Sequence, residues 1–178
     1  MRSTTRSITQ CAFVMLAVLL IAACGEDPTA PANPGQLAIR LTDAPAQDIT
    51  SINVLITGLK VKRVGEPERD FAVDAGSVDL LSLEDSSILL GSHAVEAGAY
   101  EYIMVELDEV HSSIVVGHLD VSLRIPSAKI KVLGGFDVAE GGTTTVTLDF
   151  DARDSIQQLG NGLWMMTPII VIAAIDES

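Results

Sequence analysis

The sequence Asp149-Phe150-Asp151 holds the pair of side chains best spaced for chemistry in this chain. Side chains in a β-strand alternate between the two faces of the sheet, so a strand here sets both carboxylates on one face, about 7 Å apart. Asp154 follows three residues later. Because calcium takes roughly six to eight oxygen ligands, these acids could supply part of a calcium site, although the spacing of an EF-hand loop is absent. The pair Asp149 and Asp151 could also serve a hydrolase such as a glycosidase if it lined a cleft.

A structural role for these acids is the alternative. Asp151 or Asp154 can cap a short helix predicted at residues 152–159, because a carboxylate accepts hydrogen bonds from the free N–H groups of a helix's first turn. The remaining acid is then solvated. Asp43, in the sequence Leu41-Thr42-Asp43-Ala44-Pro45, can likewise either stabilise the turn after a strand or bind a ligand.

Other catalytic sets are missing from the sequence. His93, His111 and His118 are the three histidines. One regular strand would divide His111 and His118 between opposite faces, so we expect positions at loop edges rather than a zinc site. No Gly-x-Ser-x-Gly elbow and no glycine-rich phosphate loop are present. Trp164, the only tryptophan, could stack on a sugar, but its apolar neighbours favour packing in the core.

Cys24 indicates a modification rather than catalysis. Residues 1–10 carry two arginines and no acid, and residues 11–23 form a short apolar run that ends in small residues. Such a run is typical of a cleaved signal, because it is shorter than the roughly 20 residues needed to span a bilayer. An ordinary secretory signal and a transmembrane anchor are the alternatives.

The sequence Ile21-Ala22-Ala23-Cys24 resembles the lipobox of bacterial lipoproteins. The resemblance implies a signal peptide over residues 1–23, cleavage between Ala23 and Cys24, and attachment of fatty acid such as palmitate to Cys24. Gly25 follows, and in envelopes that sort lipoproteins by this residue a glycine resembles an outer-membrane address. We therefore expect a protein anchored by lipid in the bacterial cell envelope, with its domain outside the cytoplasm.

The composition limits the classes of partner. Cleavage before Cys24 removes two of the 11 basic residues and none of the 24 acidic ones, which leaves 155 residues with a net charge of −15. A nucleic-acid binder carries the opposite sign, and attraction to anionic lipid is equally disfavoured. Cys11 leaves with the signal and Cys24 is modified, so no disulfide, thiol catalysis or cysteine-ligated metal is expected in the mature domain.

The remaining chain predicts a tether followed by one domain. Residues 24–36 contain three prolines and two glycines, the composition of an extended linker. Over residues 37–178 apolar and polar residues alternate in many segments, which predicts eight or nine strands. Residues 169–175 are apolar on both faces and predict a central strand. Because sheets with one apolar face must pair those faces, we expect an all-β, two-sheet antiparallel sandwich, Ig-like or prealbumin-like, with a barrel as the alternative.

Several blocks of sequence together resemble a bacterial lipoprotein family catalogued as domain of unknown function 4382. In chain order they are Leu41-Thr42-Asp43-Ala44-Pro45, the strand 52–64, the run 78–83, Ala97-Gly98-Ala99-Tyr100, residues 145–151, and Pro168-Ile169-Ile170-Val171. The Gly98 and Tyr100 spacing also resembles prealbumin-like and carboxypeptidase-regulatory-like sandwiches, which implies a tight turn at the glycine and a tyrosine packed at the sheet edge. Ala128-Lys129-Ile130-Lys131 stands in place of the glycine–lysine pair of the family pattern, so the resemblance gives weaker support for a ligand site there. The resemblance implies no catalytic residue.

These observations predict a non-enzymatic, lipid-anchored envelope protein that needs no cofactor and binds a glycan or a protein. A structural subunit of an envelope assembly, joined by pairing of sheet edges, is one alternative. A hydrolase or calcium-dependent binder that uses Asp149 and Asp151 is the other.

Overall fold

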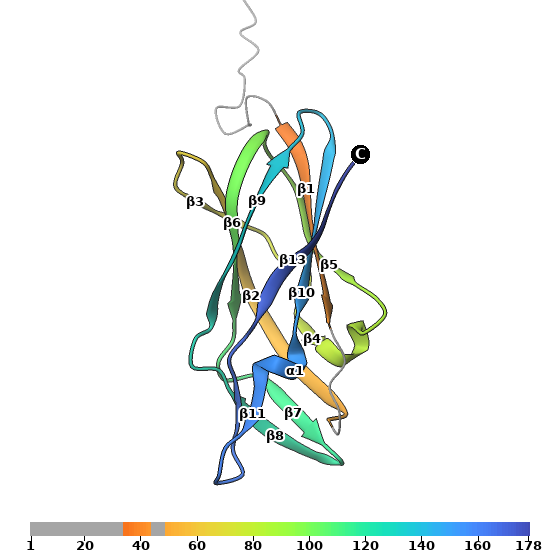
Figure 1. The fold of residues 1–178 in the computed structure, drawn as a ribbon, viewed down its shortest axis with the longest axis vertical. Helices are drawn as coiled ribbons and strands as arrows, with labels where there is room; N and C mark the ends of the chain where they lie inside the picture. The colour runs from red at the N-terminus through yellow and green to blue at the C-terminus, as the bar shows by residue number, and fades with distance from the viewer. Residues whose placement is uncertain (1–33, 44–48) are drawn as a thin grey trace, which may run out of the picture. The chain divides into compact units, whose positions relative to one another are not determined.

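The computed structural model describes residues 34–43 and 49–178. Within these ranges thirteen strands form two sheets whose inner faces meet in one core (Figure 1). The predicted all-β sandwich is confirmed. The strand count exceeds the eight or nine expected, because several strands are only three or four residues long and hold too few alternations to be recognised in the sequence.

The smaller sheet has four strands, in the spatial order β13 (Ile170–Glu177), β10 (Thr143–Phe150), β1 (Pro34–Asp43) and β5 (Ile88–Glu96). β10 shows how the sequence sets the two faces. Val146, Leu148 and Phe150 are almost completely buried, whereas Thr147 and Asp149 point to the outer face and are half-exposed. β1 runs parallel to β10, and the other neighbours in this sheet are antiparallel.

The larger sheet has nine strands. Seven follow one another in the order β11 (Ile156–Gln158), β12 (Trp164–Met166), β8 (Leu119–Arg124), β7 (Ser113–Val116), β2 (Ser51–Arg63), β6 (Gly98–Leu107) and β9 (Lys129–Val138). Two short strands, β3 (Glu68–Phe71) and β4 (Ser77–Asp79), also pair with β2. β12 and β8 run parallel, so both sheets are mixed rather than purely antiparallel.

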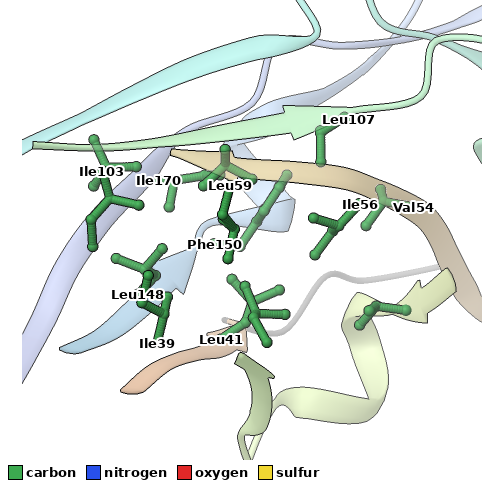
Figure 2. Close-up of a cluster of buried hydrophobic side chains, with 14 of the residues drawn as sticks. Ile39, Leu41, Val54, Ile56, Leu59, Ile103, Leu107, Leu148, Phe150 and Ile170 are labelled. Carbon is green, nitrogen blue, oxygen red and sulfur yellow. The ribbon is translucent and has the colours of Figure 1, made fainter. Parts of the chain in front are cut away.

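The core draws on both sheets (Figure 2). Phe150 of β10 is among its largest fully buried side chains and belongs to the same core cluster as Leu59 of β2. A 3₁₀ helix, η1 (Leu80–Leu83), contributes two more buried leucines beside β1 and β2. Trp164 is half-buried and packs against this core, as its apolar neighbours predicted.

The C-terminal strand β13 is an edge strand, so the predicted central position is wrong. Within the described residues it pairs only with β10. Val171 and Ile175 remain 52% and 42% exposed. The inner face of β13 is apolar because it packs against β9 of the other sheet. The two strands come so close that a Cβ at Gly134 would lie 2.9 Å from Ile172 Cδ1. β13 and β9 therefore close one side of the sandwich.

A β-bulge interrupts each long edge strand. One extra residue, Leu90, lies opposite the Ile39–Arg40 step in β5, and Ala173 is the extra residue in β13. In β9 the residues Gly134 and Gly135 lie opposite a single residue of β6. Bulges twist and break the row of free backbone groups, and natural sheets use them to avoid pairing with other chains.

Strand β1 begins at Pro34, three residues before the predicted start of the domain at residue 37. A side chain at position 35 is impossible, because a Cβ there would lie 2.3 Å from the Ala139 carbonyl oxygen. The backbone of Pro34 and Gln36 is held by Gly141 and Gly142, with N–O distances of 3.0 and 2.9 Å. Composition alone marks Pro34–Gln36 as linker, whereas the tertiary contact makes it strand. The signal, Ala23, Cys24 and the rest of the predicted tether lie outside the described residues.

The predicted helix at 152–159 is also shorter than expected. Helix α1 spans only Ala152–Ser155, and the chain continues directly into β11. In the described part of the chain, no helix has both the length and the apolar character needed to cross a bilayer.

Candidate functional site

The acidic pair singled out from the sequence lies where β10 ends. Asp149 is on the outer face of the smaller sheet, where partial burial, and then the nearby charge of Asp151, raise its pKa. Asp151 caps α1: its Oδ1 accepts a hydrogen bond from the Asp154 N–H at 3.0 Å, and its carbonyl accepts one from the Ser155 N–H at 3.1 Å. The structural interpretation of Asp151 is confirmed.

The described residues bring no three or more His, Cys, Asp or Glu side chains together as metal ligands. Asp149, Asp151 and Asp154 therefore do not converge as a calcium site. The carboxylate of Asp151 caps α1 instead. The side chain of Asp43 and residues 44–48 lie outside the described part of the chain, so the ligand role considered for Asp43 stays a prediction.

The histidines occupy loop edges and a strand. His111 Nδ1 lies 3.0 Å from Asp108 Oδ1, which also accepts hydrogen bonds from the N–H groups of Val110 and His111. These backbone hydrogen bonds, above all that from His111, lower the pKa of Asp108. His93 lies on β5, and His118 lies in the turn between β7 and β8. The geometry around His111 is that of a turn.

The Gly98 and Tyr100 motif has a clear structural role. Gly98 begins β6 with φ of +128°, and a Cβ there would lie 3.2 Å from Arg63 Nη2. The Tyr100 hydroxyl donates to the Glu96 carbonyl at 2.8 Å, and its ring stacks on Phe136 with centroids 5.2 Å apart. Burial raises the pKa of Tyr100. The glycine therefore makes room for a partly buried guanidinium, and the tyrosine packs next to the edge strand β9.

That guanidinium belongs to a neutral cluster of two arginines and two glutamates. Arg63 pairs with Glu66 and with Glu96, the latter at 3.1 Å, and donates to the Ala97 carbonyl at 3.0 Å. Arg69 pairs with the same two carboxylates at 3.1 and 3.2 Å. The charges cancel within the cluster, which joins β2, β3 and the turn between β5 and β6, so its role is structural.

The distinctive surface of this protein is the outer face of β3, β2, β6 and β9. All four lysines of the chain lie on it: Lys60 and Lys62 on β2, Lys129 and Lys131 on β9. We call this surface the lysine face. β6 runs between the two lysine strands (Figure 1) and places Met104 between them.

The strand register arranges this face in cross-strand rows. One row is Asp70, Lys60, Met104 and Lys131; the next is Glu68, Lys62, Tyr102 and Leu133; the third is Gly58, Glu106 and Lys129. Residues directly opposite each other on neighbouring strands have Cβ atoms about 5 Å apart, so members of a row can touch. The lysines therefore form two lines, separated by the side chains of β6.

The lysines differ in how far carboxylates neutralise them. Lys60 Nζ lies 3.1 Å from Asp70 and 3.9 Å from Glu106, and Lys129 Nζ lies 3.3 Å from the same Glu106 oxygen. Lys62 donates instead to the backbone carbonyl of Glu66. The hydrogen bond with Asp70 is the largest of the effects that raise the pKa of Lys60. Of the two lysines on β2, only Lys60 is paired with acids within the described residues.

Lys131 has an aromatic neighbour rather than an acidic one. Its ammonium lies 3.9 Å from the centroid of the Tyr102 ring, a cation–π contact. The Tyr102 hydroxyl donates to Glu68, and this hydrogen bond is the main cause that raises the pKa of Tyr102 to about 12. Lys131 itself is exposed, so its charge stays available to a partner.

A cleft of about 410 Å³ opens at the end of the lysine face. The cleft has two causes. The pairing of β3 with β2 ends at Phe71, and Thr57 is an extra residue at a bulge between β2 and β6. Gly58 completes the cleft, since a Cβ there would come within 3.0 Å of Glu106 Oε2. Its volume is within the range of small-ligand sites, and Asp70 and Glu106 line it.

The lysine face is electrostatically unlike the rest of the domain. Four lysines against Glu68, Asp70 and Glu106 give it a formal charge of +1, while all other residues from 34 to 178 sum to −14. Whole-chain composition hides this contrast. The signal that could have revealed it is the repeat of lysine at every second position in two alternating segments, 60–62 and 129–131.

Comparison with known proteins identifies one family. The family described as "Domain of unknown function (DUF4382)" matches residues 34–168. No curated protein and no solved structure matches the chain. The match starts at the first residue of β1 and includes every strand up to β12. It confirms the family resemblance carried by the sequence blocks, and the chain belongs to this family of domains of unknown function.

Proposed function

We propose that this protein is a lipid-anchored, non-catalytic binding module of the bacterial envelope, and that its partner contacts the lysine face. The observation that carries the proposal is the gathering of every lysine of an acidic chain on one face of one sheet. Lysines on an edge strand such as β9 can serve to prevent strand pairing, but β2 is an interior strand and has no such need.

The anchor in this proposal comes from Cys24 and its lipobox-like sequence. Pro34, the first residue of β1, lies at the end of the smaller sheet, against the turn that joins β9 to β10. The lysine face lies on the outer face of the other sheet.

Two alternatives receive less support. Assembly by pairing of sheet edges is disfavoured, because β5, β9 and β13 all carry bulges. A hydrolase that uses Asp149 and Asp151 is disfavoured, because Asp151 caps α1 and the cleft beside the lysine face is lined by other acids.

The test is co-sedimentation of the purified full chain with detergent-washed bacterial envelope material. The wild type is compared with a variant in which Lys60, Lys62, Lys129 and Lys131 are all changed to Gln, and with Arg124→Gln as a basic residue outside the face. We expect saturable binding by the wild type and Arg124→Gln, and at least tenfold weaker binding by the four-lysine variant. Equal binding by all three forms, or none by the wild type, would refute the proposal.

A further inference from the structure

We propose that the ligand of the lysine face is an extended acidic polysaccharide, an inference that rests on the proposed function. The face presents its charges at repeated positions along two strands rather than in a closed pocket. Lys60 and Lys62 are two residues apart on β2, and Lys129 and Lys131 repeat that spacing on β9. Alternate residues of a strand are about 7 Å apart, and two strand intervals are about 10 Å, so a chain molecule can lie along β6 between the two lines of lysines.

The mixture of charges favours a sugar polymer. Lys62 and Lys131 form no ion pair with an acid in the described part of the chain, so each can bind a carboxylate of an acidic sugar as a point charge. Glu106 and Glu68 lie in the same rows, and a carboxylate can accept hydrogen bonds from sugar hydroxyls. Glu106 Oε1 accepts no hydrogen bond in the described part of the chain, although two ammonium groups approach it. A polymer that carries only anionic groups would be repelled by these acids.

The same face is poorly suited to a protein partner. Protein interfaces usually depend on aromatic or arginine anchors that become buried on binding. Tyr102 is the aromatic residue in these rows, but it is only 8% exposed and its hydroxyl is already bound to Glu68. The large apolar side chain that is exposed here, Leu133 at 72%, lies at the rim on β9. The centre of the face is Met104, flanked by charged groups on both sides.

The cleft at Gly58 extends the lysine face beyond its third row. Thr57 is exposed there, and the Glu106 carboxylate lies over the glycine. A sugar unit at the end of the polymer can enter this cleft and donate a hydrogen bond from a hydroxyl to Glu106. Recognition then combines charge along the two lysine lines with hydroxyl contacts at one end.

The experiment measures binding of oligogalacturonate, a carboxylate-bearing sugar chain, to the full chain purified in neutral detergent. A neutral maltodextrin of matched length is the control ligand. We expect saturable binding of oligogalacturonate only. Lowering the screening length from about 30 Å to about 8 Å by adding salt should weaken it at least tenfold. The double variant Lys129→Gln, Lys131→Gln should bind at least about tenfold more weakly. Lys129→Arg, Lys131→Arg should bind normally, and Arg124→Gln should change affinity less than about twofold.

Two outcomes separate this inference from the proposed function. If the chain binds envelope material but not oligogalacturonate, and protease treatment of that material abolishes binding, the partner is a protein and the polysaccharide assignment is wrong. If it binds neither, the proposed function fails as well. Binding of maltodextrin equal to that of oligogalacturonate, or binding unchanged by Lys129→Gln, Lys131→Gln, also overturns the inference.

Discussion

Arg63 and Arg69 allow a matched test of the ion-pair cluster that packs against Gly98. Both arginines pair with the same carboxylates, Glu66 and Glu96. They differ in burial: the side chain of Arg63 is 31% exposed, and that of Arg69 is 57% exposed. Arg63 also donates to a backbone carbonyl. We therefore expect Arg63→Ala to cost more stability than Arg69→Ala, although each removes two ion pairs.

The magnitudes follow from that difference in exposure. Loss of an exposed ion pair costs on the order of 0.5 kcal/mol, which we expect for Arg69→Ala. Removing Arg63 leaves two half-buried carboxylates with one remaining cation and empties the space over Gly98. Partial exposure screens this charge, so we expect about 2 kcal/mol, below the range for fully buried pairs.

The assay is urea unfolding followed by the fluorescence of Trp164, the only tryptophan, which packs against the core. At about 1 M salt, where the screening length is about 3 Å, the effect of Arg69→Ala should nearly vanish. Most of the effect of Arg63→Ala should persist, because the carbonyl hydrogen bond and the packing against Gly98 do not depend on screening. Equal losses for the two variants, or a loss below about 0.5 kcal/mol for Arg63→Ala, would refute the reasoning.

Three further predictions concern the core, the tyrosines and the anchor. Phe150→Ala should lower the free energy of unfolding by about 3–5 kcal/mol, whereas Val171→Ala, 52% exposed on the neighbouring strand, should change it by about 0.5 kcal/mol or less; similar losses would contradict the core assignment. Tyr100 and Tyr102 are the only tyrosines, and spectrophotometric titration should place both above the usual pKa near 10, with Tyr102 at about 12. Because these pKa values are raised in the folded state, the stabilisation from the protonated tyrosines is complete below pH 10 and is lost as the pH rises through the folded-state values; a single transition near pH 10 would contradict it. Cells supplied with labelled palmitate should label the wild type and leave Cys24→Ala unlabelled, and equal labelling would remove the anchor from the account.

The sandwich was predictable from the sequence because apolar residues that face the core recur at every second position of the strands. For example, Val146, Leu148 and Phe150 alternate with polar residues in the sequence, and all three face the core in β10. The position of β13 could not be predicted in this way. Its apolar inner face packs against the edge of the other sheet at Gly134, and a strand apolar on both faces at a sheet edge has the same sequence pattern as a central strand.

The beginning of the domain and the lysine face were missed for related reasons. Pro34-Gly35-Gln36 has the composition of a linker, and only the contact of Gly35 with Ala139 makes it strand. The lysine face depends on the register of β2, β6 and β9, which joins segments about 70 residues apart. Net charge averages over the whole surface, so an acidic total concealed a locally positive face. By contrast the cap at Asp151 was predictable, because it is formed by neighbours in sequence.

The most direct test of the central claim is amine footprinting. The lysines all lie on one face, so an amine-reactive label on lysine side chains reports on that face alone. The full chain is labelled on intact cells and, separately, after purification in detergent, and mass spectrometry compares the modification of Lys60, Lys62, Lys129 and Lys131. We predict strong protection of Lys129 and Lys131 on cells relative to the purified chain, because a bound envelope partner covers them. Equal modification in the two settings would contradict the claim that this face is where the protein binds.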